Sequence, residues 1–118
     1  MKRKLITISD SRSVSVPSET KMSISEIAEL FGIYYREAKR EIRAIEKSVV
    51  ASGDYSLSCT VEGKNIYPEY YGVDMIVAVA FRVQAEKAEI FRRWVCRRTT
   101  QHSTHTVFTL STHGNVLN

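Results

Sequence analysis

The side chains of this sequence that could act chemically on a partner are cations gathered in one short segment. Between residues 34 and 47 they are Arg36, Lys39, Arg40, Arg43 and Lys47. A guanidinium group can bridge the O6 and N7 atoms of guanine in a planar fork, whereas a lysine ammonium pairs with phosphates as a compact charge. We therefore expect Arg36 and Arg40 to contact bases and the lysines to contact phosphates of double-stranded DNA.

The spacing of these cations predicts that a helix would gather them on one side. At about 100° per residue they fall within an arc of roughly 100°, so they should face solvent as one row. The opposite side carries Ala38, Ile42, Ile45 and Val49. A face built only for solubility would gain from mixed charges, since each i,i+4 pair of opposite sign stabilises a helix by ~0.2–0.5 kcal/mol. The segregation favours a binding face, with a solvated face as the alternative.

The residues before this segment predict a helix and a sharp corner. Ser23 and Glu26 have the spacing of a capping box, and apolar residues recur at helical spacing at positions 24, 27, 28 and 31. Gly32 can adopt the left-handed conformation that a corner requires, and a second helix is expected from about residue 34 to residue 47. This is the layout of a helix-turn-helix, whose second helix enters the major groove. Tyr34 and Tyr35 would begin that helix and join the contact surface.

Two hairpins are expected around this unit. Residues 5–8 and 14–16 are short β-branched runs that predict a small hairpin. A second hairpin is predicted from YSLSCTV and NIYPEYY, which flank Glu62, Gly63 and Lys64, and Pro68 indicates that its second strand is an edge. A hairpin after a helix-turn-helix is a wing, and Lys64 is its candidate nucleic-acid contact.

Two further helices are expected after the second hairpin. Asp74 is expected to cap the apolar run MIVAVAF, and a last helix should run from about residue 85 to residue 98. On that helix Trp94 is expected to anchor the core. Its basic residues, either solvated or in contact with phosphates, are Arg92, Arg93, Arg97 and Arg98. The predicted fold class is α+β, a winged helix-turn-helix-like domain over residues 1–98, followed by a loosely ordered Ser/Thr-rich tail over residues 99–118.

Several stretches carry a family resemblance. They are IAELFGI, the hairpin tip EGKN, YYGVDMIVAVAFRV and AEIFRRWV. With these in the same order, the chain from about residue 24 to residue 98 resembles the N-terminal region of the RhuM virulence-protein family, which has relatives among phage antirepressor-type domains. The resemblance implies a DNA-binding, winged-helix-like module. The chain departs from the family pattern at Tyr34 and Tyr35, at Gln84-Ala85 before the last helix, and in the tail.

Other classes of function find little support in the composition. The net charge of +4 and the pI near 9.2 permit an anionic partner. No apolar run reaches the ~18 residues of a membrane span, and the start is not a signal peptide, so a cytoplasmic protein without membrane contact is expected. No nucleophile–base pair, paired carboxylates or phosphate loop is present, so no catalytic residue and no cofactor are expected, and the chain is not expected to be an enzyme.

The cysteines and histidines do not predict a metal site. Cys59 and Cys96 lack CxxC spacing and are expected to be packing residues. The three histidines, His102, His105 and His113, lack carboxylate or thiolate neighbours.

Two alternatives concern partners. The same fold can serve as a protein–protein interaction module, adaptor-like or antirepressor-like, and salt dependence would separate this interpretation from groove binding. A homodimer is a further expectation, either on two half-sites or through an added edge strand from VFTLS in the tail.

Overall fold

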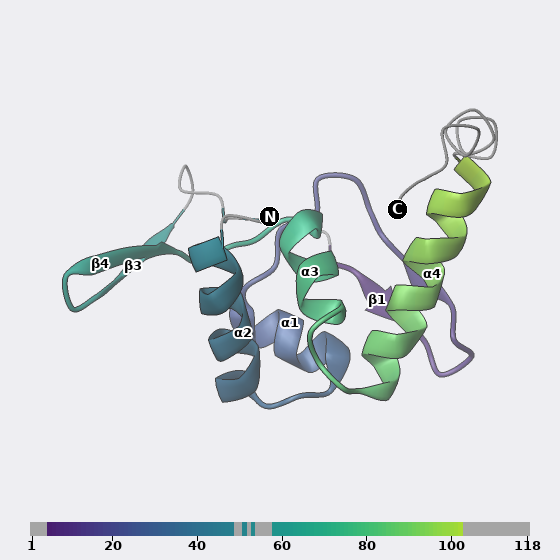
Figure 1. Ribbon diagram of the computed structural model, residues 1–118, viewed down its shortest axis with the longest axis horizontal. Helices are drawn as coiled ribbons and strands as arrows, with labels where there is room; N and C mark the ends of the chain where they lie inside the picture. Colours follow the sequence, from purple (N-terminus) through teal and green to yellow (C-terminus); the bar gives the residue numbers. More distant parts are fainter. Residues whose placement is uncertain (1–4, 49–50, 52, 54–57, 103–118) are drawn as a thin grey trace, which may run out of the picture.

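The computed structural model describes residues 5–48, 51, 53 and 58–102 of the 118-residue chain. Within these ranges, four helices and two antiparallel hairpins form an α+β fold, as predicted (Figure 1). The elements in chain order are β1 (Thr7–Ile8), β2 (Val14–Ser15), α1 (Ile24–Phe31), α2 (Tyr35–Ser48), β3 (Cys59–Glu62), β4 (Asn65–Pro68), α3 (Val73–Ala80) and α4 (Glu86–His102).

The capping box and the glycine corner that the sequence predicts before α2 are both present. The Ser23 side chain accepts a hydrogen bond from the Glu26 amide, and the Glu26 carboxylate accepts one from the Ser23 amide at 2.9 Å. This capping box satisfies amides that the first turn of a helix leaves without partners. Gly32 ends α1 in the left-handed conformation, with φ of 69°. Ile33 then packs against the core, which turns the chain into α2.

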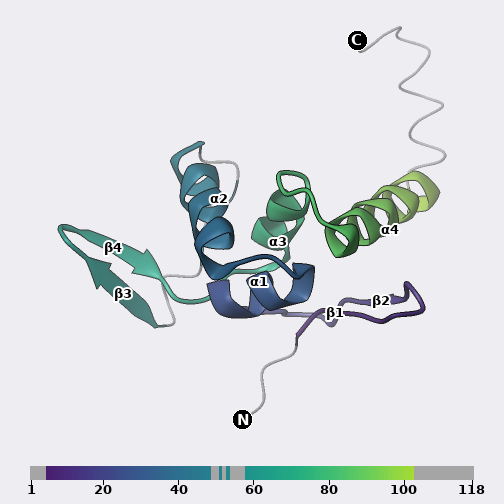
Figure 2. The ribbon, with the colours of Figure 1, turned by 90° about the horizontal axis from the view of Figure 1, so that it is seen from below.

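The core lies among the four helices. Figures 1 and 2 show α3 between α2 and α4, while α1 crosses beside them and packs on both α2 and α4. Phe31 of α1 and Phe91 of α4 meet edge to face, with ring centroids 5.8 Å apart. The largest fully buried side chains are Tyr71, Phe31, Phe91, Met22, Ile27, Ile42, Ile45, Met75, Ile76, Val79 and Val83.

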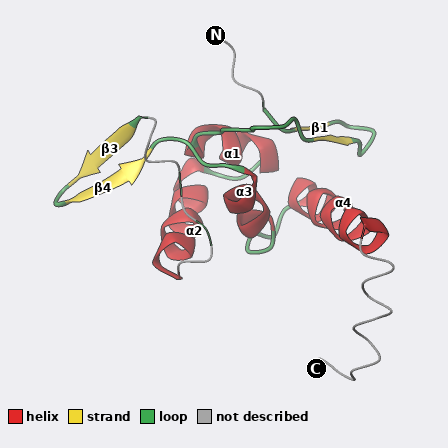
Figure 3. Ribbon diagram, turned by 90° about the horizontal axis from the view of Figure 1, so that it is seen from above, coloured by secondary structure: helices red, strands yellow, loops and turns green. Residues whose placement is uncertain are grey.

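The two hairpins occupy different places. The β1–β2 hairpin, with Ile8 opposite Val14, lies against α4 and is shorter than the runs that predicted it (Figure 3). The β3–β4 hairpin projects from the body beside α2 (Figure 1). Between the hairpin and α3, Tyr71 pairs with Met22 through two backbone hydrogen bonds of 2.8 and 2.9 Å. This bridge ties the start of α1 to the start of α3.

Three predictions about single residues are wrong. Asp74 is not the cap of α3: the helix begins after Gly72, and the Asp74 carboxylate accepts a hydrogen bond from the Met75 amide within the first turn. Cys59 and Cys96 are exposed. Cys59 is exposed because it lies on the projecting β3–β4 hairpin, where its neighbours Thr60 and Val61 are exposed as well.

Trp94 is only partly buried. Its ring stacks on Phe91 at 5.8 Å between centroids, so it packs against the edge of the core and not at its centre. Trp94 lies at the middle of α4, where the helix begins to leave the body (Figure 2). The helix continues to His102, beyond the expected end at residue 98. No helix in the described ranges is long and apolar enough to span a bilayer.

Candidate nucleic-acid interface

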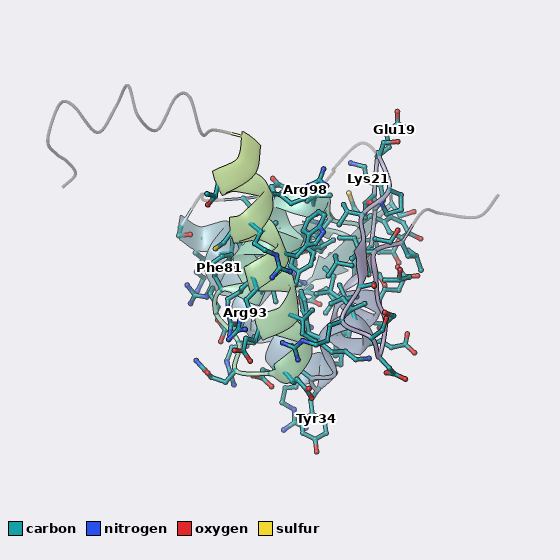
Figure 4. The ribbon with its side chains drawn as sticks, turned by 90° about the vertical axis from the view of Figure 1, so that its right-hand side faces the viewer. Glu19, Lys21, Tyr34, Phe81, Arg93 and Arg98 are labelled. Atoms are coloured by element: carbon teal, nitrogen blue, oxygen red, sulfur yellow. The ribbon has the colours of Figure 1, made fainter. Side chains whose placement is uncertain are left out.

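The first part of the predicted surface is the start of α2. Tyr34 and Tyr35 are exposed, at 84% and 50%, and Figure 4 shows Tyr34 pointing away from the body at one end of the molecule. Arg36 and Arg40 are also exposed. With Glu37, these four side chains line an open hollow on the surface.

Burial of the opposite side fixes the rotation of α2. Ala38, Ile42 and Ile45 are buried in the core, so the residues across the helix from them must face outward.

The first turn of α2 closes through a hydrogen bond from the Ala38 amide to the Tyr34 carbonyl at 3.0 Å. Amides at a helix start carry positive partial charge, which adds to the charge of the nearby arginines.

Few negatively charged side chains contact the two arginines near this helix start. Within the described part of the chain, the Arg36 side chain makes neither a hydrogen bond nor an ion pair. Arg40 lies 3.6 Å from Glu41, whose other carboxylate oxygen accepts a hydrogen bond from Arg82 at 2.6 Å. Both guanidinium groups are therefore available to an anionic ligand.

The expectation of a single solvent-facing row of cations is wrong for Lys39 and Arg43. The Lys39 ammonium lies 2.8 Å from the Glu62 carboxylate at the end of β3. Arg43 lies 3.6 Å from the same carboxylate, and its guanidinium carbon is 3.6 Å from the centroid of the Tyr67 ring on β4. These two cations face the β3–β4 hairpin.

Arg43 is also held from the side of the core. It donates hydrogen bonds to the Tyr71 hydroxyl at 3.0 Å and to the Glu46 carboxylate at 3.3 Å, and its side chain is only 16% exposed. We name the set of Lys39, Arg43, Glu62 and Tyr67 the hairpin clamp. Tyr71 and Glu46 connect the clamp to the core.

The pKa values in this network follow from burial and charge. Burial raises the pKa of Tyr71 to about 12, and the nearby Glu46 carboxylate acts in the same direction. Burial also raises the pKa of Glu46, against the lowering effect of Arg43. Burial lowers the pKa of Arg43, but the Tyr71 hydroxyl and the two carboxylates outweigh it, so the net direction is upward. Hydrogen bonding from Lys39 lowers the pKa of Glu62.

The other two predicted residues lie apart from the start of α2. Lys47 is exposed in the last turn of α2, at the far end of the helix. Lys64 is exposed in the turn of the hairpin, next to Gly63, whose φ of +64° confirms the predicted turn. The structure therefore divides the predicted site residues among the start of α2, its last turn, the hairpin turn and the hairpin clamp.

Sequence reasoning missed the partners in and behind the clamp. Strand alternation could have placed Glu62 and Tyr67 on one face of the hairpin, because Thr60 pairs with Tyr67 and Glu62 with Asn65. No local pattern indicated that this face would meet α2. The opposite face carries Val61 and Ile66, a cross-strand pair exposed at 68% and 59%.

The basic cluster of α4 is also divided. Arg92 donates hydrogen bonds to the backbone carbonyls of Ala80 and Val83, at 2.6 and 3.0 Å, and so joins α4 to the end of α3. Arg93 pairs with Glu89 at 3.0 Å, and the Arg98 guanidinium lies 5.1 Å from the Trp94 ring. Figure 4 labels Arg93 and Arg98 on α4. Arg92 therefore has a structural role, whereas Arg93, Arg97 and Arg98 remain on the surface.

The described residues contain no group of three His, Cys, Asp or Glu side chains that could hold a metal ion. His105, His113 and the predicted edge strand VFTLS lie outside the described residues, as does the side chain of His102. Comparisons with protein-family models, with curated proteins and with solved structures find no match to this chain.

Proposed function

We propose that this chain binds double-stranded DNA as a winged helix-turn-helix-like module, with α2 as the helix that enters the major groove. The observation that carries the proposal is the start of α2, where Tyr34, Tyr35, Arg36 and Arg40 are exposed together on a helix whose other side is buried. Helices that read DNA present their N-terminal residues to base edges in this way. The stretches that resemble the RhuM family imply the same kind of module, although no family model matches the chain.

The structure suggests a role for each exposed side chain. Arg36 and Arg40 can reach guanine edges through their planar forks, and the two tyrosine hydroxyls can donate hydrogen bonds to phosphates. Lys47 and Lys64 would contact phosphates on either side of the helix. Lys39 and Arg43 are occupied by the hairpin, so we assign them no direct contact with DNA.

The test is the double variant Arg36→Ala with Arg40→Ala, measured by duplex binding over a series of salt concentrations. Both side chains point away from the core, so the melting temperature should stay near that of the parent. Binding should weaken, and the slope of log affinity against log salt should flatten by about 0.9 for each phosphate that the variant can no longer neutralise. Removal of a base contact should instead cost ~1–3 kcal/mol on the preferred sequence.

The matched control is Arg93→Ala with Arg97→Ala, which removes the same charge from exposed positions on α4. It should leave the affinity and the salt slope close to those of the parent. If the α2 variant binds duplex DNA as the parent does, with the same salt slope, the start of α2 is only a solvated surface and the proposal fails.

A second candidate function is protein–protein interaction through the hairpin. The specific observation is the exposed pair Val61 and Ile66, which places two β-branched side chains in solvent on a projecting hairpin. Such a pair suits an apolar surface on another protein. Val61→Thr with Ile66→Thr should abolish binding to such a partner and spare duplex binding, and the partner complex should be insensitive to salt.

A further inference from the structure

The β3–β4 hairpin meets the body with its polar face. Its side toward α2 carries Glu62 and Tyr67, while the apolar pair Val61 and Ile66 faces solvent. Among the residues of β3 and β4, only Pro68, at the base of the hairpin, is a buried apolar side chain. Hydrophobic packing therefore does not hold the outer part of this hairpin in place, and its angle to α2 depends on ionic and cation–π contacts.

These contacts converge on Arg43 from four partners. The guanidinium lies over the Tyr67 ring, near the Glu62 carboxylate, and donates to Tyr71 and Glu46. A planar cation with several fixed donors can satisfy all of these directions only in one orientation. Lys39 adds a second contact to Glu62, at 2.8 Å, about one helical turn earlier.

The core side of the hairpin clamp, where Arg43 meets Tyr71, is rigid. Tyr71 is fully buried and is fixed by its backbone pairing with Met22. Arg43 therefore connects the hairpin to the point where the starts of α1 and α3 are joined. Motion of the hairpin relative to α2 would have to break several of these contacts together.

We propose that Lys39 and Arg43 are positioning residues, which hold the hairpin at one angle to α2 through Glu62 and Tyr67. The second half of the proposal rests on the proposed function: this angle determines which duplex geometry can meet the start of α2 and Lys64 at the same time. The clamp would thus select for DNA shape without touching the DNA.

The role of Glu62 distinguishes positioning from direct electrostatics. A carboxylate on a DNA-binding hairpin repels phosphates, so its removal should tighten binding if only charge matters. If Glu62 holds the hairpin in place, its removal should weaken binding even though the protein becomes more positive. The two accounts predict opposite signs for one substitution.

The first experiment measures the hairpin angle without DNA. Spin labels on Cys96 of α4 and on Lys64→Cys at the hairpin turn, in a Cys59→Ser background, should give one narrow distance distribution. Arg43→Gln and Glu62→Gln should broaden or shift it, and the control Glu69→Gln, which removes an exposed charge beyond the end of β4, should not. Because Glu62 is a surface residue, its variant should fold even if Arg43→Gln does not. An unchanged distribution in Glu62→Gln would overturn the proposal.

The second experiment measures duplex binding by unlabelled variants. Glu62→Gln should weaken binding several-fold, and in that background Lys64→Ala should cost much less than it does in the parent. The cost of Arg36→Ala should persist in both backgrounds, because it lies outside the clamp. Binding that is unchanged or tighter in Glu62→Gln, with additive costs for Lys64→Ala, would overturn the second half of the proposal.

The two experiments separate this inference from the proposed function. If the parent does not bind duplex DNA at all, the proposed function fails and the second half of the inference fails with it. A change of the label distances in Glu62→Gln would still support the positioning role of the clamp in that case.

Discussion

At the scale of single residues, Arg36 and Arg43 show how contact with a neighbouring hairpin changes the role of an arginine. They are seven residues apart on α2, so their side chains leave the helix in nearly the same direction. The Arg36 side chain is exposed and makes no hydrogen bond or ion pair within the described structure, whereas Arg43 meets a tyrosine ring, a tyrosine hydroxyl and two carboxylates. One is available for a ligand, and the other has become part of the fold.

Gly63 provides a residue-scale prediction. Its φ of +64° lies in the left-handed region, and an added Cβ would meet no atom within 4 Å, so any cost of a side chain comes from the backbone alone. Gly63→Ala should destabilise the fold by about 1 kcal/mol, measured by urea unfolding. An unchanged free energy of unfolding in Gly63→Ala would contradict the turn assignment.

At the scale of elements, the β3–β4 hairpin reverses the usual arrangement of a surface hairpin. Antiparallel hairpins commonly pack their apolar face on the core and leave the polar face in water. Here the polar face meets α2, and Val61 and Ile66 lie in water. Because these contacts are ionic, the stability of the hairpin's position should depend on pH. A hairpin held by apolar packing would show no such dependence.

Glu62 determines the direction of that dependence. Its pKa in the folded protein is lowered from 4.5, so its contribution to stability is present above that value and is lost as the pH falls through the lowered pKa. Thermal unfolding of the parent and of Glu62→Gln should differ most near neutral pH and converge in acid. Glu46 has the opposite effect on the free energy of unfolding, because its raised pKa means that its ionised form costs stability at neutral pH. Since Glu46 is present in both proteins, it largely cancels from the comparison; a difference that persists at the lowest pH would contradict the role of the Glu62 charge.

At the scale of the whole molecule, two polar side chains join elements that apolar packing already brings together. Tyr71 connects the starts of α1 and α3 with α2, through its backbone and its hydroxyl. Arg92 connects α4 to the end of α3 through the carbonyl of Ala80, the last residue of that helix, and to the following loop through the carbonyl of Val83. The second connection matters because the C-terminal half of α4 leaves the body (Figure 2).

Arg92 and Arg93 form a matched pair for testing this connection. Arg92→Ala removes two charge-assisted hydrogen bonds to part-buried carbonyls and should cost ~1.5–3 kcal/mol in urea unfolding. Arg93→Ala removes only an exposed i,i+4 pair with Glu89 and should cost about 0.3–0.5 kcal/mol. If the two neighbouring substitutions cost the same, Arg92 does not hold α4 to α3.

Much of the fold follows from the sequence because its signals act over a few residues. The capping box of Ser23 and Glu26, the corner at Gly32, the turn at Gly63 and the buried side of α2 with Ala38, Ile42 and Ile45 were all predicted and are all present. Val49, the fourth apolar residue expected on that side, lies outside the described residues. Each depends on backbone conformation or on the angle between neighbouring side chains of one element. The same angle correctly placed Arg36 and Arg40 on the exposed side of α2.

Only the tertiary structure determined which elements lie against each face of a helix or hairpin. The periodicity of α2 gives the direction of Arg43 but not the presence of Tyr71, 28 residues later, or of the hairpin. The same limit explains Arg92, whose acceptors lie 12 residues earlier in α3 and 9 residues earlier in the loop that follows it. It also explains Trp94, which the body only partly covers. A side chain's direction is a local property of the backbone, whereas its partners depend on how separate elements pack, and a periodic pattern carries no information about that packing.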